Sequence, residues 1–242
     1  MNNADVLRFR FSVVYTLSFI ALLWLIKVVE WGLSFDFGVW GIHPRTLTGT
    51  LGIITAPLIH GDFTHLISNS FPLILLGIGV LYFYKDIAIP VFLWIYLATG
   101  VFVWVLARDA YHIGASGVVY GLVAFLFFSG LFRRDPRSIA IAFAVILLYG
   151  GMFYGVIPTD PNISWESHLL GSIVGICMSF YYKDVPLSVD KPNFALAEGE
   201  EKEEEKIPAP SNSFWTTTHD NAGTTFTYTY SENKSNTSTK GQ

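Results

Sequence analysis

Apolar residues follow one another in long runs over most of the chain, and polar residues are largely confined to the gaps between the runs. A helix needs about 20 apolar residues to cross the hydrocarbon core of a bilayer. The pattern therefore predicts an all-α fold, a polytopic membrane helix bundle with six transmembrane helices. The predicted helices cover residues 11–30, 64–84, 89–107, 115–132, 138–157 and 165–182.

The predicted membrane domain, residues 11–183, follows a short polar lead, residues 1–10. Most connections between its helices are only a few residues long. The exception is the connection 31–63, which is rich in glycine and aromatic residues. We expect this segment to be partly embedded in the outer leaflet, as irregular backbone whose polar groups are satisfied by protein or water.

The character of the chain changes after residue 183, where an acidic cluster precedes a region dominated by Ser, Thr, Asn and Gly. Such a composition buries too little apolar surface to offset ordering entropy, so residues 184–242 are predicted to be a disordered tail. The alternation of Thr with aromatic residues over 224–230 permits a strand as the less favoured interpretation. A chain truncated after Lys183 is expected to keep its activity.

Composition agrees with a membrane protein, because only 14% of the 242 residues are charged, against about 25% in soluble domains. Lys and Arg gather next to the predicted inner ends of the helices, which places both termini in the cytoplasm. The first apolar run is longer than the core of a cleaved signal, so it is predicted to be retained. No basic patch interleaved with aromatic residues is large enough to argue for a nucleic-acid partner.

Polar residues inside predicted spans are candidates for function, because burying them in lipid is costly. His65 and Asn69 lie in the second span, Ser116 in the fourth and His168 in the sixth. These three spans run in the same direction, and all four residues lie near their outer ends. The sequence therefore predicts one polar site at a single depth of the membrane.

The residue types suit nucleophilic catalysis. Ser116 lies between Gly114 and Gly117, which permit close backbone approach, and free N–H groups at a helix start favour an oxyanion. His168 is the candidate general base toward Ser116. Tyr120, one turn after Ser116, is the candidate side chain to orient the His168 ring.

The remaining candidates support this pair. Small residues on the fourth and sixth spans predict close helix packing: Gly117 and Gly121, and Gly171 and Gly175. His65 and Asn69 are four residues apart on one helix face, and both can donate hydrogen bonds to an oxyanion.

Each residue also has a plainer interpretation. Ser116 in a small-residue motif is often only packing, Asn69 can join helices, and Tyr120 can fill a core. His60 and His65 with Glu166 and His168 suggest a metal site. The spacing of five between the first two does not place them on one helix face, and HExxH is absent from the sequence. We therefore expect neither metal nor cofactor.

In combination, these residues resemble the rhomboid family of intramembrane serine proteases. The matching pieces are His60-x4-His65-x3-Asn69, the run from Gly114 to Tyr120 (GASGVVY), and His168-x2-Gly171-x3-Gly175. The segment from Gly41 to Arg45 also resembles the long first loop of bacterial members, although Pro-Arg stands where many members have Trp-Arg.

The resemblance implies a Ser–His dyad without Asp, with Ser116 as nucleophile and His168 as general base. It implies an oxyanion hole made of the Ser116 N–H and the side chains of His65 and Asn69. The expected partners are membrane lipids and single-span membrane proteins, cut near the outer membrane face. The fifth span, with Gly150, Gly151 and Gly155, would be the lateral gate, and the expected location is a bacterial inner membrane.

Two other functions stay open at this point. One is a catalytically inactive relative that binds membrane clients for trafficking or degradation, although such relatives usually lack the Ser or the His. The other is a small-solute channel or transporter, which needs polar groups through the full membrane depth. The inner halves of the predicted spans are nearly free of such groups.

Overall fold

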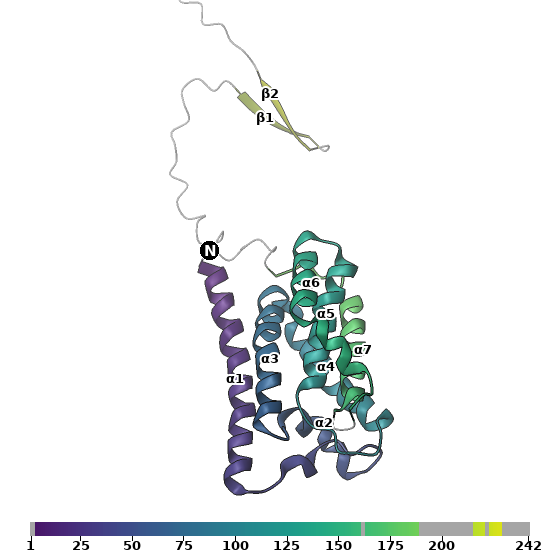
Figure 1. Cartoon of the computed structure of the whole chain (residues 1–242). Helices are drawn as coiled ribbons and strands as arrows, with labels where there is room; N and C mark the ends of the chain where they lie inside the picture. The colour runs from purple at the N-terminus through teal and green to yellow at the C-terminus, as the bar shows by residue number, and fades with distance from the viewer. Residues whose placement is uncertain (1–2, 161–162, 189–214, 221–222, 229–242) are drawn as a thin grey trace, which may run out of the picture. The chain divides into compact units, whose positions relative to one another are not determined.

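The computed structural model of the chain describes residues 3–160, 163–188, 215–220 and 223–228. It divides the chain into two units, Met1–Pro192 and Asn193–Gln242. The regular structure described in the first unit is entirely helical, as the sequence predicts, and its long helices lie side by side (Figure 1). These helices are α1 (Asn3–Leu33), α3 (Phe63–Phe83), α4 (Lys85–Leu106), α5 (Ser116–Arg133), α6 (Pro136–Tyr149) and α7 (Trp165–Tyr181).

Four of these helices, α1, α3, α4 and α5, are long and apolar enough to cross a membrane. The helix α6 has 14 residues and α7 has 17. The predicted single helix over residues 138–157 is wrong, because α6 ends at Tyr149 and a 3₁₀ segment, η4 (Gly150–Val156), follows. Two consecutive glycines at 150 and 151 explain the change, since glycine weakens an α-helix.

The helix α5 is the centre of the bundle. It packs against α3, α4, α6 and α7. In its most apolar 18-residue stretch 61% of the residues are buried, against 28–33% in the corresponding stretches of α1, α3 and α4. Glycines set its distance from α7: a Cβ atom at Gly171 would collide with the carbonyl oxygen of Gly117, and one at Gly175 with that of Gly121. The two helices therefore meet backbone to backbone, which brings their first turns together.

The connection between α1 and α3 is less irregular than predicted. It consists largely of short helical turns: η1 (Phe37–Trp40), η2 (Thr48–Thr50), α2 (Gly52–Thr55) and η3 (Ala56–Leu58). Arg45 fixes this connection to the end of α4, because its guanidinium donates to the carbonyl oxygen of Ala107 at 2.7 Å.

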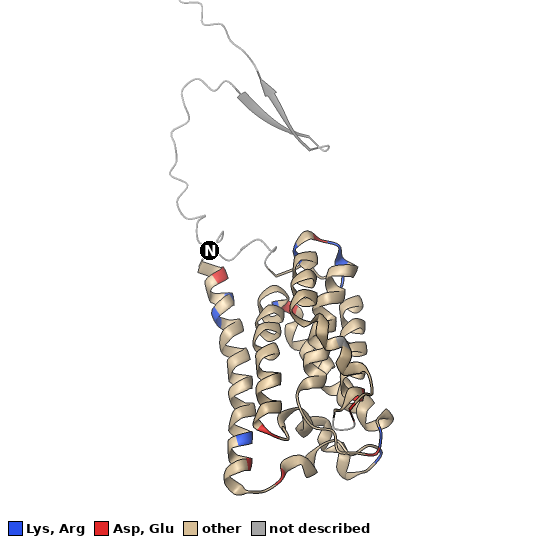
Figure 2. Ribbon diagram, viewed as in Figure 1, with Lys and Arg blue, Asp and Glu red and all other residues tan. Residues whose placement is uncertain are grey.

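A buried ion pair ties α1 to the same connection. Lys27 Nζ lies 2.8 Å from Glu30 Oε2 and donates to the carbonyl oxygens of His60 and Gly61, both at 2.9 Å. Other charged residues gather at the two ends of the bundle (Figure 2). A buried charge is tolerated when its hydrogen bonds are made, and here those bonds hold the segment that leads into α3.

His60 lies in that segment and is almost completely buried, at 1% exposure. The backbone N–H of Ala115 donates to its Nε2 at 3.4 Å. Burial lowers the pKa of His60 to about 4, so the ring is neutral at pH 7. A neutral acceptor in the α1–α3 connection therefore holds the residue before Ser116.

Residues 184–188 extend the packed body beyond the predicted boundary at residue 183. Leu187 is 1% exposed, and the N–H of Ser188 donates to the carbonyl oxygen of Phe83 at 2.9 Å. Arg133 donates to the carbonyl oxygens of Tyr182 and Val185. This short segment therefore belongs to the helical unit.

In the second unit, β1 (Trp215–Asp220) pairs antiparallel with β2 (Gly223–Tyr228). The strand β2 falls on the alternation of Thr with aromatic residues for which a strand was the less favoured interpretation, and both residue types favour strands. The rest of the predicted tail from residue 189 lies outside the described residues.

The sequence analysis expects a chain truncated after Lys183 to keep its activity. We now expect this truncation to destabilise the protein, because it removes Leu187 from the core. Leu187→Ala alone should cost about 2–5 kcal/mol, as for other buried leucines. Thermal unfolding in detergent would measure both effects. Truncation after Pro192, which removes only the second unit, is the control; equal stability of the two truncated chains would contradict the packing of residues 184–188.

Stability should also fall as the pH falls from 6.5 toward 4. In this range the unfolded state binds a proton at His60, whose ordinary pKa is 6.5, while the folded state does so only near pH 4. The total loss should be about 3 kcal/mol, since one pKa unit corresponds to about 1.36 kcal/mol. His60→Gln, whose amide oxygen can still accept the Ala115 N–H, should flatten the dependence; an unchanged slope would contradict the buried neutral ring.

Candidate active site

Ser116 is the first residue of α5, and the backbone before it depends on Gly114. Gly114 has φ +104°, a left-handed conformation that favours glycine. A Cβ atom there would also lie 2.6 Å from the His65 ring. The N–H of Gly114 donates to the carbonyl oxygen of Ala56 at 2.9 Å. Gly114 therefore turns the chain tightly into α5, directly beside His65.

His168 lies in the first turn of α7 and faces Ser116. Its Nε2 is 2.8 Å from Ser116 Oγ, and the side chain is buried. The two residues are 52 positions apart in the chain and meet because α5 and α7 pack so closely. A hydroxyl and an imidazole in this arrangement can exchange a proton.

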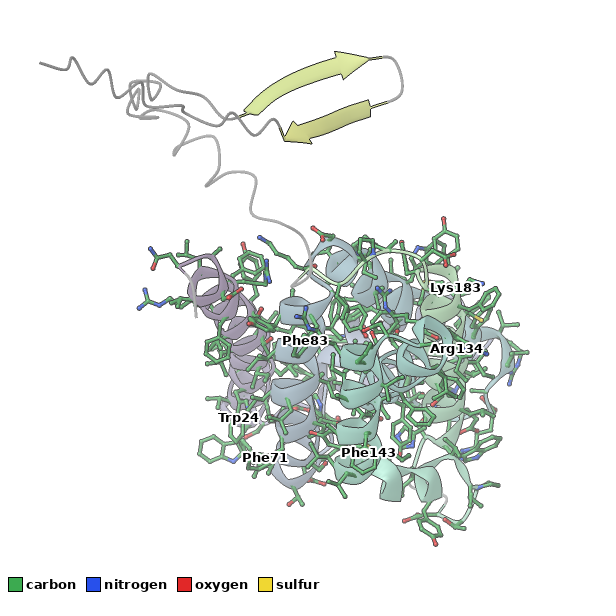
Figure 3. The ribbon with its side chains drawn as sticks, turned by 90° about the horizontal axis from the view of Figure 1, so that it is seen from above. Trp24, Phe71, Phe83, Arg134, Phe143 and Lys183 are labelled. Atoms are coloured by element: carbon green, nitrogen blue, oxygen red, sulfur yellow. The ribbon has the colours of Figure 1, made fainter. Side chains whose placement is uncertain are left out.

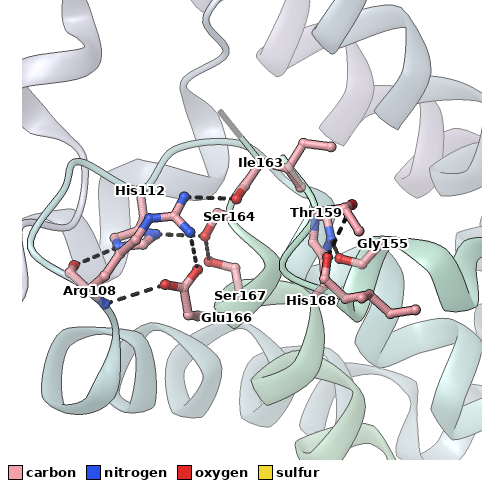
Figure 4. Close-up of polar contacts among 10 residues, drawn as sticks. Arg108, His112, Gly155, Thr159, Ile163, Ser164, Glu166, Ser167 and His168 are labelled. Carbon is pink, nitrogen blue, oxygen red and sulfur yellow. Dashed lines mark hydrogen bonds and ion pairs between the residues drawn. The ribbon is translucent and has the colours of Figure 1, made fainter. Parts of the chain in front are cut away.

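The other ring nitrogen, Nδ1, is 2.7 Å from the carbonyl oxygen of Gly155 in η4 (Figure 4). A carbonyl can only accept, so Nδ1 carries the proton and Nε2 of the neutral ring is free to accept from Ser116. The Tyr120 ring stacks on the His168 ring, with centroids 4.1 Å apart and planes 5° apart. Tyr120 Oη donates to the carbonyl oxygen of Met152 at 2.9 Å.

His65 and Asn69 lie on the first turns of α3. Asp62 caps this helix by accepting the His65 N–H at 2.7 Å, and Asn69 Nδ2 donates to the carbonyl oxygen of His65 at 3.2 Å. Both side chains line a cavity of about 860 Å³ together with Ser116 and His168. The candidates from three separate helices thus share one cavity.

The remaining predicted residues do not line this cavity but pack beside or behind the residues that do. His60 is buried behind His65, with ring centroids 5.1 Å apart. Gly117, Gly171 and Gly175 lie in the interface between α5 and α7. The described residues contain no group of three or more His, Cys, Asp or Glu arranged to hold a metal ion.

A polar network that sequence reasoning missed holds the start of α7. Arg108 Nη1 lies 3.3 Å from Glu166 Oε2, and Arg108 Nη2 donates to the carbonyl oxygen of Ile163 at 2.8 Å (Figure 4). Glu166 is buried two residues before His168. The sequence analysis considered Glu166 only as a metal ligand; its signal was a single acid in the first turn of an apolar helix.

His112 extends the network from the connection between α4 and α5. Its Nε2 donates to the carbonyl oxygen of Arg108 at 3.1 Å, so Nδ1 accepts from the Ser164 hydroxyl at 2.6 Å. Burial lowers the pKa of His112, which keeps the ring neutral. The connection that precedes Ser116 is thereby joined to the residues that precede His168.

Comparison with known proteins places these features in context. The rhomboid domain matches residues 48–184. An uncharacterized protein of Mycobacterium tuberculosis is 33% identical over 178 residues, which cover 68% of this chain and 72% of the relative. An uncharacterized protein of Mycobacterium leprae is 31% identical over 185 residues, 72% of each chain.

A more distant relative carries a descriptive name. The Bacillus subtilis protein named "Putative rhomboid protease YdcA" is 29% identical over 141 residues, 53% of this chain and 65% of the relative. The domain match itself spans more than half of the chain and takes in α3 to α7, with both Ser116 and His168. The chain belongs to the rhomboid family.

Proposed function

We propose that the protein is an intramembrane serine endopeptidase, with Ser116 as nucleophile and His168 as general base. The observation that carries this proposal is the 2.8 Å contact between Ser116 Oγ and His168 Nε2 inside a polar cavity. The Nδ1 contact to Gly155 supports the tautomer that a base requires. A protein that only binds clients has no need of this arrangement.

In the proposed reaction, His168 Nε2 takes the hydroxyl proton while Ser116 Oγ attacks the carbonyl carbon of the scissile bond. The resulting oxyanion accepts hydrogen bonds from the Ser116 N–H and the side chains of His65 and Asn69. The imidazolium then gives its proton to the leaving amine. Water, activated by the same imidazole, hydrolyses the acyl-enzyme and restores the serine.

The proposed substrates are single-span membrane proteins that reach the cavity between α3 and α6. Residues from both sides line it: Pro72 from α3, and Tyr149 and Met152 from the end of α6 and from η4. Exposed Phe71 of α3 and Phe143 of α6 lie on the same side of the bundle (Figure 3). An apolar substrate helix fits such a lipid-facing side, while the polar cavity admits water.

We further propose that α6 with η4, and α7, complete a six-span bundle in a bacterial inner membrane, with both termini cytoplasmic. Support comes from the charged residues at the two ends of the bundle (Figure 2). Under this topology Arg133 and Lys183 are on the inner side, as the positive-inside rule favours. The cavity then opens toward the outer face.

Ser116→Ala and His168→Ala should each lower cleavage of a single-span model substrate by about 10⁴-fold or more. Ser116→Ala should also abolish labelling by a fluorescent fluorophosphonate, because the attacking oxygen is gone. Ser68→Ala is the matched control, since Ser68 lines the same cavity but donates to the carbonyl oxygen of His65. Wild-type turnover by either dyad variant would refute the dyad; a folded wild type without labelling or cleavage would favour the client-binding function.

Asn69→Ala should lower kcat by about 10²–10³-fold with little change in KM, because an oxyanion donor acts mainly in the transition state. Steady-state cleavage in detergent would separate the two constants. A rise in KM at constant kcat would show instead that Asn69 binds the substrate in its ground state.

A further inference from the structure

His168 faces a backbone carbonyl at the position where serine hydrolases commonly place a carboxylate. The carbonyl belongs to Gly155, and its oxygen lies 2.7 Å from His168 Nδ1. Gly155 is in η4, the segment directly after α6, and the proposed function has the substrate reach the cavity between α3 and α6. The group that faces the base therefore belongs to a segment beside the proposed path of the substrate.

The segment η4 is bonded to the site at a second point. Tyr120 Oη donates to the carbonyl oxygen of Met152 at 2.9 Å, and the Tyr120 ring stacks on His168. The His168 ring is thus held at two places: its Nδ1 edge bonds to the Gly155 carbonyl, and its plane packs on the Tyr120 ring. A displacement of η4 would loosen both contacts together.

Position 155 has no room for a side chain. A Cβ atom there would collide with Tyr120 Oη and lie 3.2 Å from His168 Nδ1. Position 151 in the same segment differs, because a Cβ atom there has nothing within 4 Å. Glycine is thus required at the point where η4 meets the base, and not merely for the conformation of η4.

We propose that Gly155 is a positioning residue, whose carbonyl holds the neutral ring of His168 in the tautomer that leaves Nε2 as the acceptor for the Ser116 proton. This proposal rests on the proposed function for its catalytic meaning, although the contact itself does not. It makes docking of η4 a condition for an effective base. A neutral carbonyl also avoids the desolvation cost of a carboxylate buried in the bundle.

The tautomer can be read directly from the ¹⁵N spectrum of histidine-labelled protein in detergent, with the His168 signals assigned by their loss in His168→Ala. We expect a protonated Nδ1 and an unprotonated Nε2 for His168 in the wild type. Gly155→Ala should mix the two tautomers, whereas Gly151→Ala should leave the wild-type spectrum. A protonated Nε2 in the wild type, or an unchanged spectrum in folded Gly155→Ala, would overturn the proposal.

Turnover gives the second readout. Gly155→Ala should lower kcat by about 10²-fold or more at similar KM, because a wrongly oriented base slows the chemical step. Gly151→Ala should keep wild-type turnover, and an equal loss there would assign the effect to η4 in general.

Tyr120→Phe tests whether the collision with Tyr120 causes the loss of activity in Gly155→Ala, since it removes the hydroxyl that a Cβ atom at position 155 would meet. Alone it should lower kcat by about tenfold, the effect of one hydrogen bond. Combined with Gly155→Ala it should raise kcat above that of Gly155→Ala alone, a coupling expected only for groups in contact. Strictly additive losses in folded variants would contradict the contact.

The protease function and the positioning role of Gly155 can be refuted independently of each other. The spectrum requires no substrate, so a wild type with the expected tautomer that is neither labelled nor active would refute the protease and retain the role of Gly155 in fixing the ring. An active, labelled wild type with the opposite tautomer would do the reverse. If Gly155→Ala does not fold, the wild-type spectrum decides: a protonated Nδ1 on His168 supports the proposal, and a protonated Nε2 overturns it.

Discussion

The close approach of α5 and α7 is the constraint on which the site depends. The carbonyl oxygens of Gly117 and Gly121 occupy space that a Cβ atom at Gly171 or Gly175 would need. In lipid, helices gain little from burying apolar surface against each other, so close backbone packing has to provide the association. Only at this short separation does the first turn of one helix bring a serine within 2.8 Å of a histidine on the other.

The features that follow from the alternation of apolar runs and polar gaps along the chain were predictable from the sequence. Apolar runs gave the helices, and polar residues at the outer ends of alternate runs pointed to Ser116 and His168. Contacts made by backbone atoms were not predictable, because the sequence carries no sign of where a carbonyl points. Gly155 was noted only as one of several glycines near a gate, and the spatial relation to His168 appears only after η4 leaves the α-helical path.

Charged residues show the same limit. Lys27 and Arg108 each pair with a buried acid, Glu30 or Glu166. Arg108 and Glu166 are 58 positions apart, so no local pattern reports their pairing. Lys27 and Glu30 are three residues apart on α1, a spacing that allows contact, but nothing local reports the bonds from Lys27 to the carbonyl oxygens of His60 and Gly61. The same holds for residues 184–188, where no local pattern indicates that Leu187 is buried.

The lengths of the helices bear on the surrounding lipid. At 1.5 Å per residue, α7 is about 26 Å long, against about 30 Å for the hydrocarbon core of a typical bilayer, whereas α1 is about 46 Å long. A helix shorter than the hydrocarbon core is met by local thinning of the bilayer, and a longer one by tilt. The helix that carries His168 is therefore the one whose surroundings depend most directly on the acyl-chain length of the lipids.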